Sequence, residues 1–171
     1  MQSVEDEFGR DGRKLYLDGS AASRLMRQLA AGVSACVTVT HVDGLVLARS
    51  AFHHSMNYRS VVAFGTARPI DDADRKTAAL RVISEHLIAG RWAEVRGPNE
   101  KELRATVVLE FLIEEASAKT RSGPPIDDVE DYSWPVWAGV VPLDVAWRNP
   151  VTETPNMAEP TYVRRPPVTL A

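Results

Sequence analysis

Hydrophobic and polar residues change their spacing several times along the chain, and each spacing predicts a different element. Apolar and polar residues alternate over residues 14–18, which predicts a strand with one face in water. Gly19 breaks this pattern, and Ser20 is a suitable N-cap for a short helix that ends at Gly32. The apolar face of that helix consists of Leu25, Met26 and Leu29.

The middle of the chain has the composition of β-structure. Residues 33–41 are rich in valine and threonine, and residues 42–44 (Val-Asp-Gly) predict a tight hairpin turn. Residues 45–52 are then the return strand. Residues 59–67 predict a third strand, in which Gly65 suggests a bulge.

A helical pattern follows, and it is the longest in the sequence. It starts at residues 69–72, where two aspartates suit a helix N-terminus, and it ends at Gly90. Residues 91–99 are a predicted loop. Residues 105–113 are apolar and β-branched enough for a buried strand.

The last third of the chain has weaker patterns. Residues 114–133 are polar and contain a Gly-Pro-Pro sequence, so we expect an irregular loop there. Residues 135–147 predict a final strand. Residues 148–171 are rich in proline and show no periodicity, which is typical of a tail or an arm.

These elements predict one domain that is mainly β with helices (α+β). It combines antiparallel strands with one short and one long helix, which favours a small barrel capped by helices. The domain is expected over residues 14–147. Residues 1–13 form a polar lead-in that ends in a turn at Asp11-Gly12.

Composition and charge narrow the possible partners. The chain has 171 residues and a net charge of −3, which gives no electrostatic reason to expect nucleic acid or an anionic membrane. No apolar run is long enough for a transmembrane helix, and the N-terminus lacks the apolar segment of a signal peptide. We therefore expect a cytoplasmic protein. Cys36 is the single cysteine, so no intramolecular disulfide can form.

The clearest candidate for chemistry lies where the first strand turns into the short helix. The first N–H groups of a helix point outward and attract anions. Ser20 and Ser23 can add hydroxyl hydrogen bonds, and Arg24 can clamp a phosphate with two parallel bonds. The alternative is an ordinary N-cap beside one surface arginine.

A second cluster surrounds two adjacent histidines. Neighbours on a strand face opposite sides, so His53 and His54 could not bind one ion together there, and we expect no metal site. Tyr58, Arg59 and Ser60 open the third strand, where their side chains can reach the polar groups of a ligand. The alternative is a polar end of a hairpin.

Two later positions are candidates of the same kind. Lys119 lies near the Gly-Pro turn, where it can line a pocket or be solvated. Trp137 precedes a glycine in the final strand, where it can cover a flat aromatic ring or belong to the core. The sequence has no glycine-rich nucleotide motif and no Ser/His/Asp order, so any redox chemistry requires a bound cofactor.

Four motifs, in this order, resemble one family. They are residues 19–24, 45–62, 115–119 and 135–139. Together they are similar to the FMN-binding split-barrel family related to pyridoxamine 5'-phosphate oxidase, in its flavin-nucleotide-binding subgroup. The resemblance runs from about Lys14 to Leu143 and implies a split β-barrel homodimer with FMN at the subunit interface.

The resemblance also implies roles for single residues. Ser23 and Arg24 match the pair that binds the flavin phosphate, with Ser20 assisting. Ser60 stands where the oxidases have a glutamine that contacts the flavin, and Trp137 matches a tryptophan beside it. Tyr58, Arg59 and Lys119 would complete the cofactor site.

Two departures from the family pattern change the expected activity. Family members usually begin with a further helix and strands, which the resemblance implies this chain lacks. The proline-rich tail stands in place of the segment that binds pyridoxal phosphate, so we do not expect a true pyridoxamine 5'-phosphate oxidase. We expect an FMN-dependent oxidoreductase that uses an unidentified small-molecule substrate or a reduced nicotinamide. A flavin carrier or sensor without turnover, and a split barrel that binds heme or a deazaflavin, remain alternatives.

Overall fold

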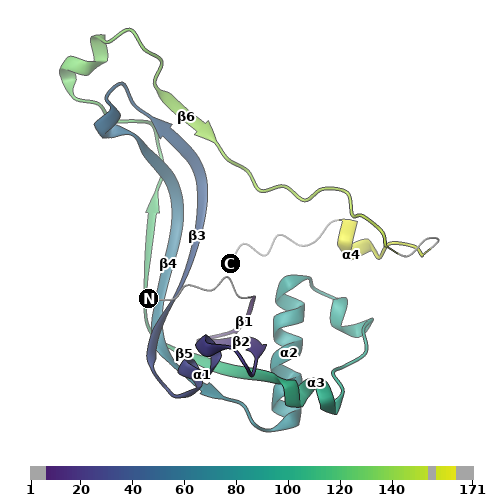
Figure 1. Ribbon diagram of the computed structural model, residues 1–171. Coiled ribbons are helices and arrows are strands. Elements are labelled where there is room, and N and C mark those ends of the chain that lie inside the picture. Colours follow the sequence, from purple (N-terminus) through teal and green to yellow (C-terminus); the bar gives the residue numbers. More distant parts are fainter. Residues whose placement is uncertain (1–6, 154–156, 165–171) are drawn as a thin grey trace. The chain divides into compact units, whose positions relative to one another are not determined.

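The computed structural model describes residues 7–153 and 157–164, and these residues contain one six-stranded sheet (Figure 1). The strand order is β1-β2-β5-β4-β3-β6, and the pairs β1–β2, β2–β5 and β3–β6 are antiparallel. The strands are β1 (Phe8–Asp11), β2 (Lys14–Ser20), β3 (Ser34–Leu47), β4 (Ser55–Pro69), β5 (Thr106–Arg121) and β6 (Gly139–Pro142).

Helices occupy the connections, and the longest one agrees with the prediction. The Asp72 side chain caps its N-terminus by accepting from Arg75 N–H at 2.8 Å. The α-helices are α1 (Arg24–Ala30), α2 (Ala73–Leu87), α3 (Glu100–Ala105) and α4 (Thr161–Arg164), and the short 3₁₀ helices are η1 (Ala51–His53), η2 (Arg91–Ala93) and η3 (Val129–Ser133). None of the helices in the described ranges is long and apolar enough to cross a membrane.

The chain forms two compact units. Unit 1 consists of Met1–Ala35, Phe64–Glu115 and Trp147–Ala171, and unit 2 consists of Cys36–Ala63 and Ala116–Ala146. The strands β3, β4 and β5 contribute residues to both units.

In unit 1 the two faces of β2 bury different partners because side chains alternate along a strand. Leu15 and Leu17 are buried on one face, in register with Phe111 and Leu109 of β5. On the other face Tyr16 packs against the buried cluster of Ile70, Ala79 and Val108. Helix α2 lies along β1 and β2 (Figure 1).

Unit 1 also receives the C-terminal segment, which was predicted as a tail or an arm. Its described end forms the short helix α4. The Tyr162 hydroxyl accepts a hydrogen bond from Arg91 Nη1 at 3.2 Å and also contacts the Glu94 carboxylate. These bonds attach α4 to the η2 turn.

The predicted hairpin at residues 42–44 is wrong. β3 runs without a break from Ser34 to Leu47, and Gly44 pairs with Pro142 of β6. A two-residue hairpin turn needs a positive φ angle, and Gly44 is not among the glycines with positive φ. Residues 42–44 have the composition of a turn, but they lie within β3, inside the sheet. The chain reverses later, through η1.

Other boundaries also differ from the prediction. β1 was not predicted, and β5 continues through residues 114–121, which were expected to be loop. Those residues are polar because almost all of them are exposed, so no apolar pattern marks the strand. The final strand was predicted over residues 135–147, but it covers only β6 (Gly139–Pro142). Gly65 lies in β4 where a Cβ atom would be 1.9 Å from the Leu112 carbonyl oxygen, so close approach of β5 requires this glycine.

Candidate functional site

The predicted phosphate-binding residues lie together at the start of α1, in unit 1. Ser23, not Ser20, is the N-cap, and its Oγ accepts from Met26 N–H at 3.4 Å. Ser20 ends β2, and its Oγ accepts from Ala22 N–H at 3.2 Å. Each hydroxyl is thus an acceptor toward the backbone and keeps its own proton free to donate.

Arg24 follows directly as the first residue of α1 and is exposed. No salt bridge within the described residues engages its guanidinium. The buried side chains of Met26 and Leu29 hold α1 in place. Two hydroxyl donors and one free cation therefore share a short stretch of chain, which is a chemistry suited to a phosphate.

The predicted ligand residues of β4 lie in unit 2 and are already engaged with β3. The Arg59 guanidinium donates two hydrogen bonds to the Asp43 carboxylate, at 3.0 and 2.9 Å. These bonds lower the pKa of Asp43. Ser60 Oγ lies 2.7 Å from Thr40 Oγ1. Because side chains alternate on a strand, Tyr58 and Ser60 share one face and Arg59 points to the other.

Lys119 and Trp137 are both exposed, also in unit 2. Lys119 lies on β5. Trp137 is 65% exposed, so the alternative of a core position is wrong. Its ring folds back over the start of β6, where a Cβ at Gly139 would lie 2.7 Å from Trp137 Cζ2. A side chain at position 139 would displace the indole.

His53 and His54 were expected to lie on a strand, where they could not bind one ion together, and this expectation is also wrong. His53 belongs to η1 and His54 follows it, so neither residue is in a strand. His54 Nδ1 accepts from Ala48 N–H at 2.9 Å, whereas His53 Nε2 lies 3.1 Å from Asp128 Oδ2. The two rings therefore have separate partners, set by the 3₁₀ turn.

Sequence reasoning missed Asp127, whose side chain is completely buried in unit 2. Its carboxylate accepts from the N–H groups of Arg49 and Ser50, at 2.9 and 3.2 Å. It also accepts from Arg49 Nη1 at 3.1 Å, and the Arg49 guanidinium lies 5.1 Å from the centre of the Tyr132 ring. Burial raises the pKa of Asp127, but these hydrogen bonds outweigh it, and the pKa is lowered. The sequence offers no signal, because Asp127 stands in an acidic run that resembles an exposed loop.

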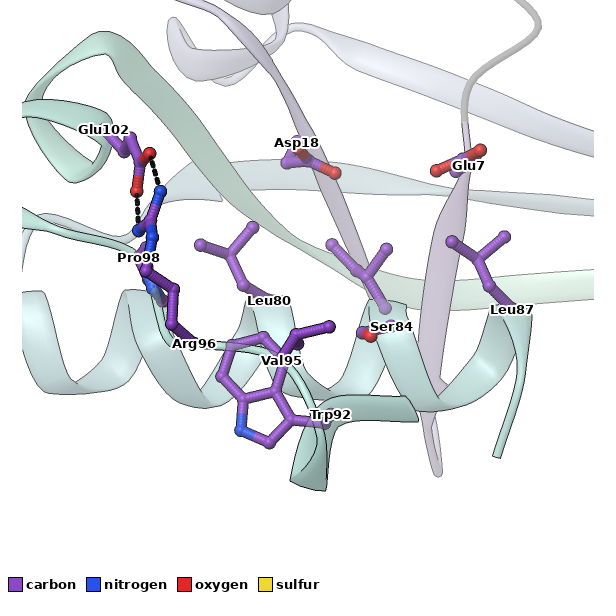
Figure 2. Close-up of a pocket in the computed structure, with 11 residues that line it drawn as sticks. Glu7, Asp18, Leu80, Ser84, Leu87, Trp92, Val95, Arg96, Pro98 and Glu102 are labelled. Carbon is purple, nitrogen blue, oxygen red and sulfur yellow. Dashed lines mark hydrogen bonds and ion pairs between the residues drawn. The ribbon is translucent and has the colours of Figure 1, made fainter. Parts of the chain in front are cut away.

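Sequence reasoning also missed a hollow in unit 1, with a volume of about 410 Å³ (Figure 2). Leu80 and Leu87 of α2 point into it, and Trp92 lies at its edge (Figure 2). Arg96 donates to the Glu102 carboxylate at 2.6 and 2.8 Å. That pairing, with a further bond from Asn99 N–H, lowers the pKa of Glu102 to about 2. The hollow is therefore lined by apolar side chains next to an ion pair, in which the charges of Arg96 and Glu102 neutralise each other.

Comparison with known proteins shows which family has this architecture. The family model described as pyridoxamine 5'-phosphate oxidase matches residues 7–120. The chain belongs to the pyridoxamine 5'-phosphate oxidase family. The predicted family and fold class are confirmed: the chain has the mainly β split-barrel fold with antiparallel strands and helices. No curated protein matches the chain.

Two solved structures resemble this family member over almost its full length. The flavocytochrome Anf3 from Azotobacter vinelandii is 40% identical, with a TM-score of 0.85, over 93% of this chain and 75% of that one. The FAD and heme binding protein from Mycobacterium smegmatis is 42% identical, with a TM-score of 0.83, over 92% of this chain and 78% of that one.

The buried Asp127 predicts an acid-dependent loss of stability. A carboxyl with a lowered pKa contributes stability that is complete above its ordinary pKa and is lost as the pH falls through the lowered value. We expect the denaturant midpoint of the chain, followed by tryptophan fluorescence, to fall once the pH drops below 3.8, the ordinary value for this group. In Asp127→Asn this component is absent and the midpoint at pH 7 is lower.

The matched control is Asp144→Asn, because Asp144 is exposed in the same unit. It should leave both the midpoint and its pH dependence unchanged. Equal midpoints for Asp127→Asn and the unmodified chain at pH 7 would show that the buried carboxylate does not hold the loop.

Proposed function

We propose that the chain is a redox protein that binds a flavin and a heme. The observation that carries this proposal is the identity of 40% and 42%, over 93% and 92% of the chain, with proteins described as a flavocytochrome and as FAD and heme binding. The second description favours FAD over the FMN that the sequence predicted. Heme, an alternative at the sequence level, becomes part of the proposal.

The start of α1 fits the flavin phosphate. Ser20 and Ser23 each keep a hydroxyl proton available, and Arg24 has no competing ion pair among the described residues. A guanidinium and two hydroxyls supply charge-assisted hydrogen bonds of the kind that hold phosphate. A bound flavin would exchange electrons with a reduced nicotinamide or another small molecule, and a bound heme would exchange them singly.

The hydrogen bonds, ring contacts and exposure of the four histidines indicate which of them would bind a heme iron. His54 accepts a backbone N–H at Nδ1, so its proton is on Nε2, where iron would bind. His53 faces Asp128, and His86 packs on the Phe8 ring with centroids 5.0 Å apart. His41 is exposed on β3, and no hydrogen bond within the described ranges occupies its ring. We propose that His41 would bind the heme iron.

The exposed apolar side chains of unit 2 support a homodimer. Phe52 is 89% exposed, Val129 87%, Trp134 64% and Trp137 65%. Apolar side chains of this size rarely remain in contact with water in such numbers unless a partner covers them. A second copy of the chain is the partner that we propose.

The optical spectrum of the purified chain tests the proposed function. We expect flavin bands together with a Soret band, and FAD in the acid extract. His41→Ala should remove the Soret band and leave the flavin bands, whereas the control His86→Ala should keep both. A colourless protein that takes up neither added FAD nor added hemin would refute the proposal. Flavin bands that NADH and NADPH fail to bleach would favour a carrier without turnover.

Arg24→Ala is expected to weaken flavin binding. Losing a charge-assisted bond to phosphate lowers affinity about 10- to 100-fold, measured by fluorescence titration of the apoprotein with FAD. The control is Arg27→Ala, in the last turn of the same helix and also exposed, which should bind FAD as the unmodified chain does. If both variants bind equally, the phosphate lies elsewhere.

Light scattering tests the dimer. The single chain has a mass of 18.8 kDa, and we expect twice that mass at micromolar concentration. Phe52→Glu should shift the equilibrium toward the single chain, because a carboxylate would be buried without a partner. A single-chain mass at every concentration of the unmodified protein would contradict the dimer.

A further inference from the structure

We propose that unit 2 carries a binding site for a divalent transition-metal ion, formed by His53, Asp128 and Asp131. The three residues come from two 3₁₀ turns that are far apart in the sequence. His53 ends η1, Asp128 stands at the N-cap position of η3, and Asp131 lies in the first turn of η3. None of them has a role in the flavin and heme binding proposed above.

The distances suit one ion. His53 Nε2 lies 3.1 Å from Asp128 Oδ2, and the ligand atoms of all three residues lie within 4.8 Å of one another. Zinc binds nitrogen and oxygen ligands at about 2.0–2.2 Å, so two ligand atoms on one ion lie about 3–4 Å apart. His53 Nε2 and Asp128 Oδ2 already have that separation. A small side-chain rotation would bring the ligand atom of Asp131 to the same distance from them.

The local charge favours a cation. Asp128 and Asp131 bring two carboxylates together, and in the part of the chain that the structure describes no lysine or arginine forms a salt bridge with either. Asp127, their neighbour, has Arg49 as its partner. Two nearby carboxylates repel each other, and a divalent ion removes that repulsion.

The protein holds the two turns together without help from an ion. Asp127 accepts from Ser50 N–H, and Ser50 Oγ caps η1 by accepting from Phe52 N–H. The residue after Asp127 is the ligand Asp128. The ligands on both turns are therefore tied to one buried carboxylate, so binding an ion requires little ordering of the backbone.

The side chains are placed to receive an ion from solvent. The Phe52 ring meets the His53 ring edge-on, with centroids 5.3 Å apart. The side chain of His53 is 24% exposed and that of Asp128 is 68% exposed. Water can enter and fill the remaining coordination positions.

The donor set identifies the class of metal. One imidazole nitrogen and two carboxylate oxygens suit zinc, manganese or ferrous iron, whereas calcium and magnesium prefer oxygen alone. The set has no thiolate, which copper(I) would require. Zinc is the appropriate probe, because it is redox-inactive and binds both ligand types.

The experiment is a calorimetric titration of zinc chloride into the chelator-treated, tag-free chain. We expect one ion per chain, with affinity lowered at least tenfold in His53→Ala and in Asp131→Asn. The matched controls are His86→Ala and Asp144→Asn, which change the same residue types elsewhere and should bind zinc as the unmodified chain does. Circular dichroism checks that each variant is folded.

Three outcomes would overturn the proposal. They are a titration without saturation, an affinity that does not change in His53→Ala, and an equal loss of affinity in His86→Ala. Because zinc binding is measured without flavin or heme, its failure would leave the proposed function intact. A colourless chain that binds zinc at His53 would support this site alone.

Discussion

The geometry of unit 2 depends on one buried carboxylate. Asp127 accepts hydrogen bonds from the backbone at Arg49 and Ser50 and from the Arg49 side chain, so it joins the connection between β3 and β4 to the segment that follows β5. Desolvation alone would make this charge costly. Its three donors compensate the burial, and they act only while the two segments remain together. The carboxylate therefore fixes where η1 and η3 lie, and with them His53 and Asp128.

In unit 1, the position of the candidate site depends on the burial of strand β2. Leu15 and Leu17 are buried on one face of β2, beside Phe111 and Leu109 of the neighbouring strand β5, and Tyr16 on the other face packs against the buried cluster beneath α2. The last residue of β2, Ser20, and the cap of α1, Ser23, are thereby held at the end of a rigid strand. The hydroxyl groups of Ser20 and Ser23 lie at this corner because the strand ends there and because buried side chains anchor the helix that follows.

The sequence predicted the parts of the structure that bury a regular apolar pattern. β2 and α2 were recognisable because Leu15 and Leu17 alternate and the face of α2 repeats every helical turn. β3 was misread because Asp43-Gly44 has the composition of a turn, whereas Asp43 serves as the partner of Arg59 across the sheet. The far end of β5 carried no pattern because its side chains are exposed. Of the candidate site, Ser23 and Arg24 could be found from a local helix start, but the partners of Asp127 come from residues nearly eighty positions earlier in the chain, which no local pattern reports.

The four histidines show why residue type alone does not assign a role. His54 uses Nδ1 to accept a backbone N–H, and His86 presents its ring to Phe8. These contacts make them structural. His53 presents Nε2 to Asp128, which suits a metal shared with a carboxylate, and His41 is exposed with no hydrogen bond to its ring in the described residues. An imidazole binds iron or zinc only through a nitrogen that carries no proton. His53 must therefore lose the proton at Nε2 when a metal ion replaces its contact with Asp128, and residue type alone does not separate the four rings.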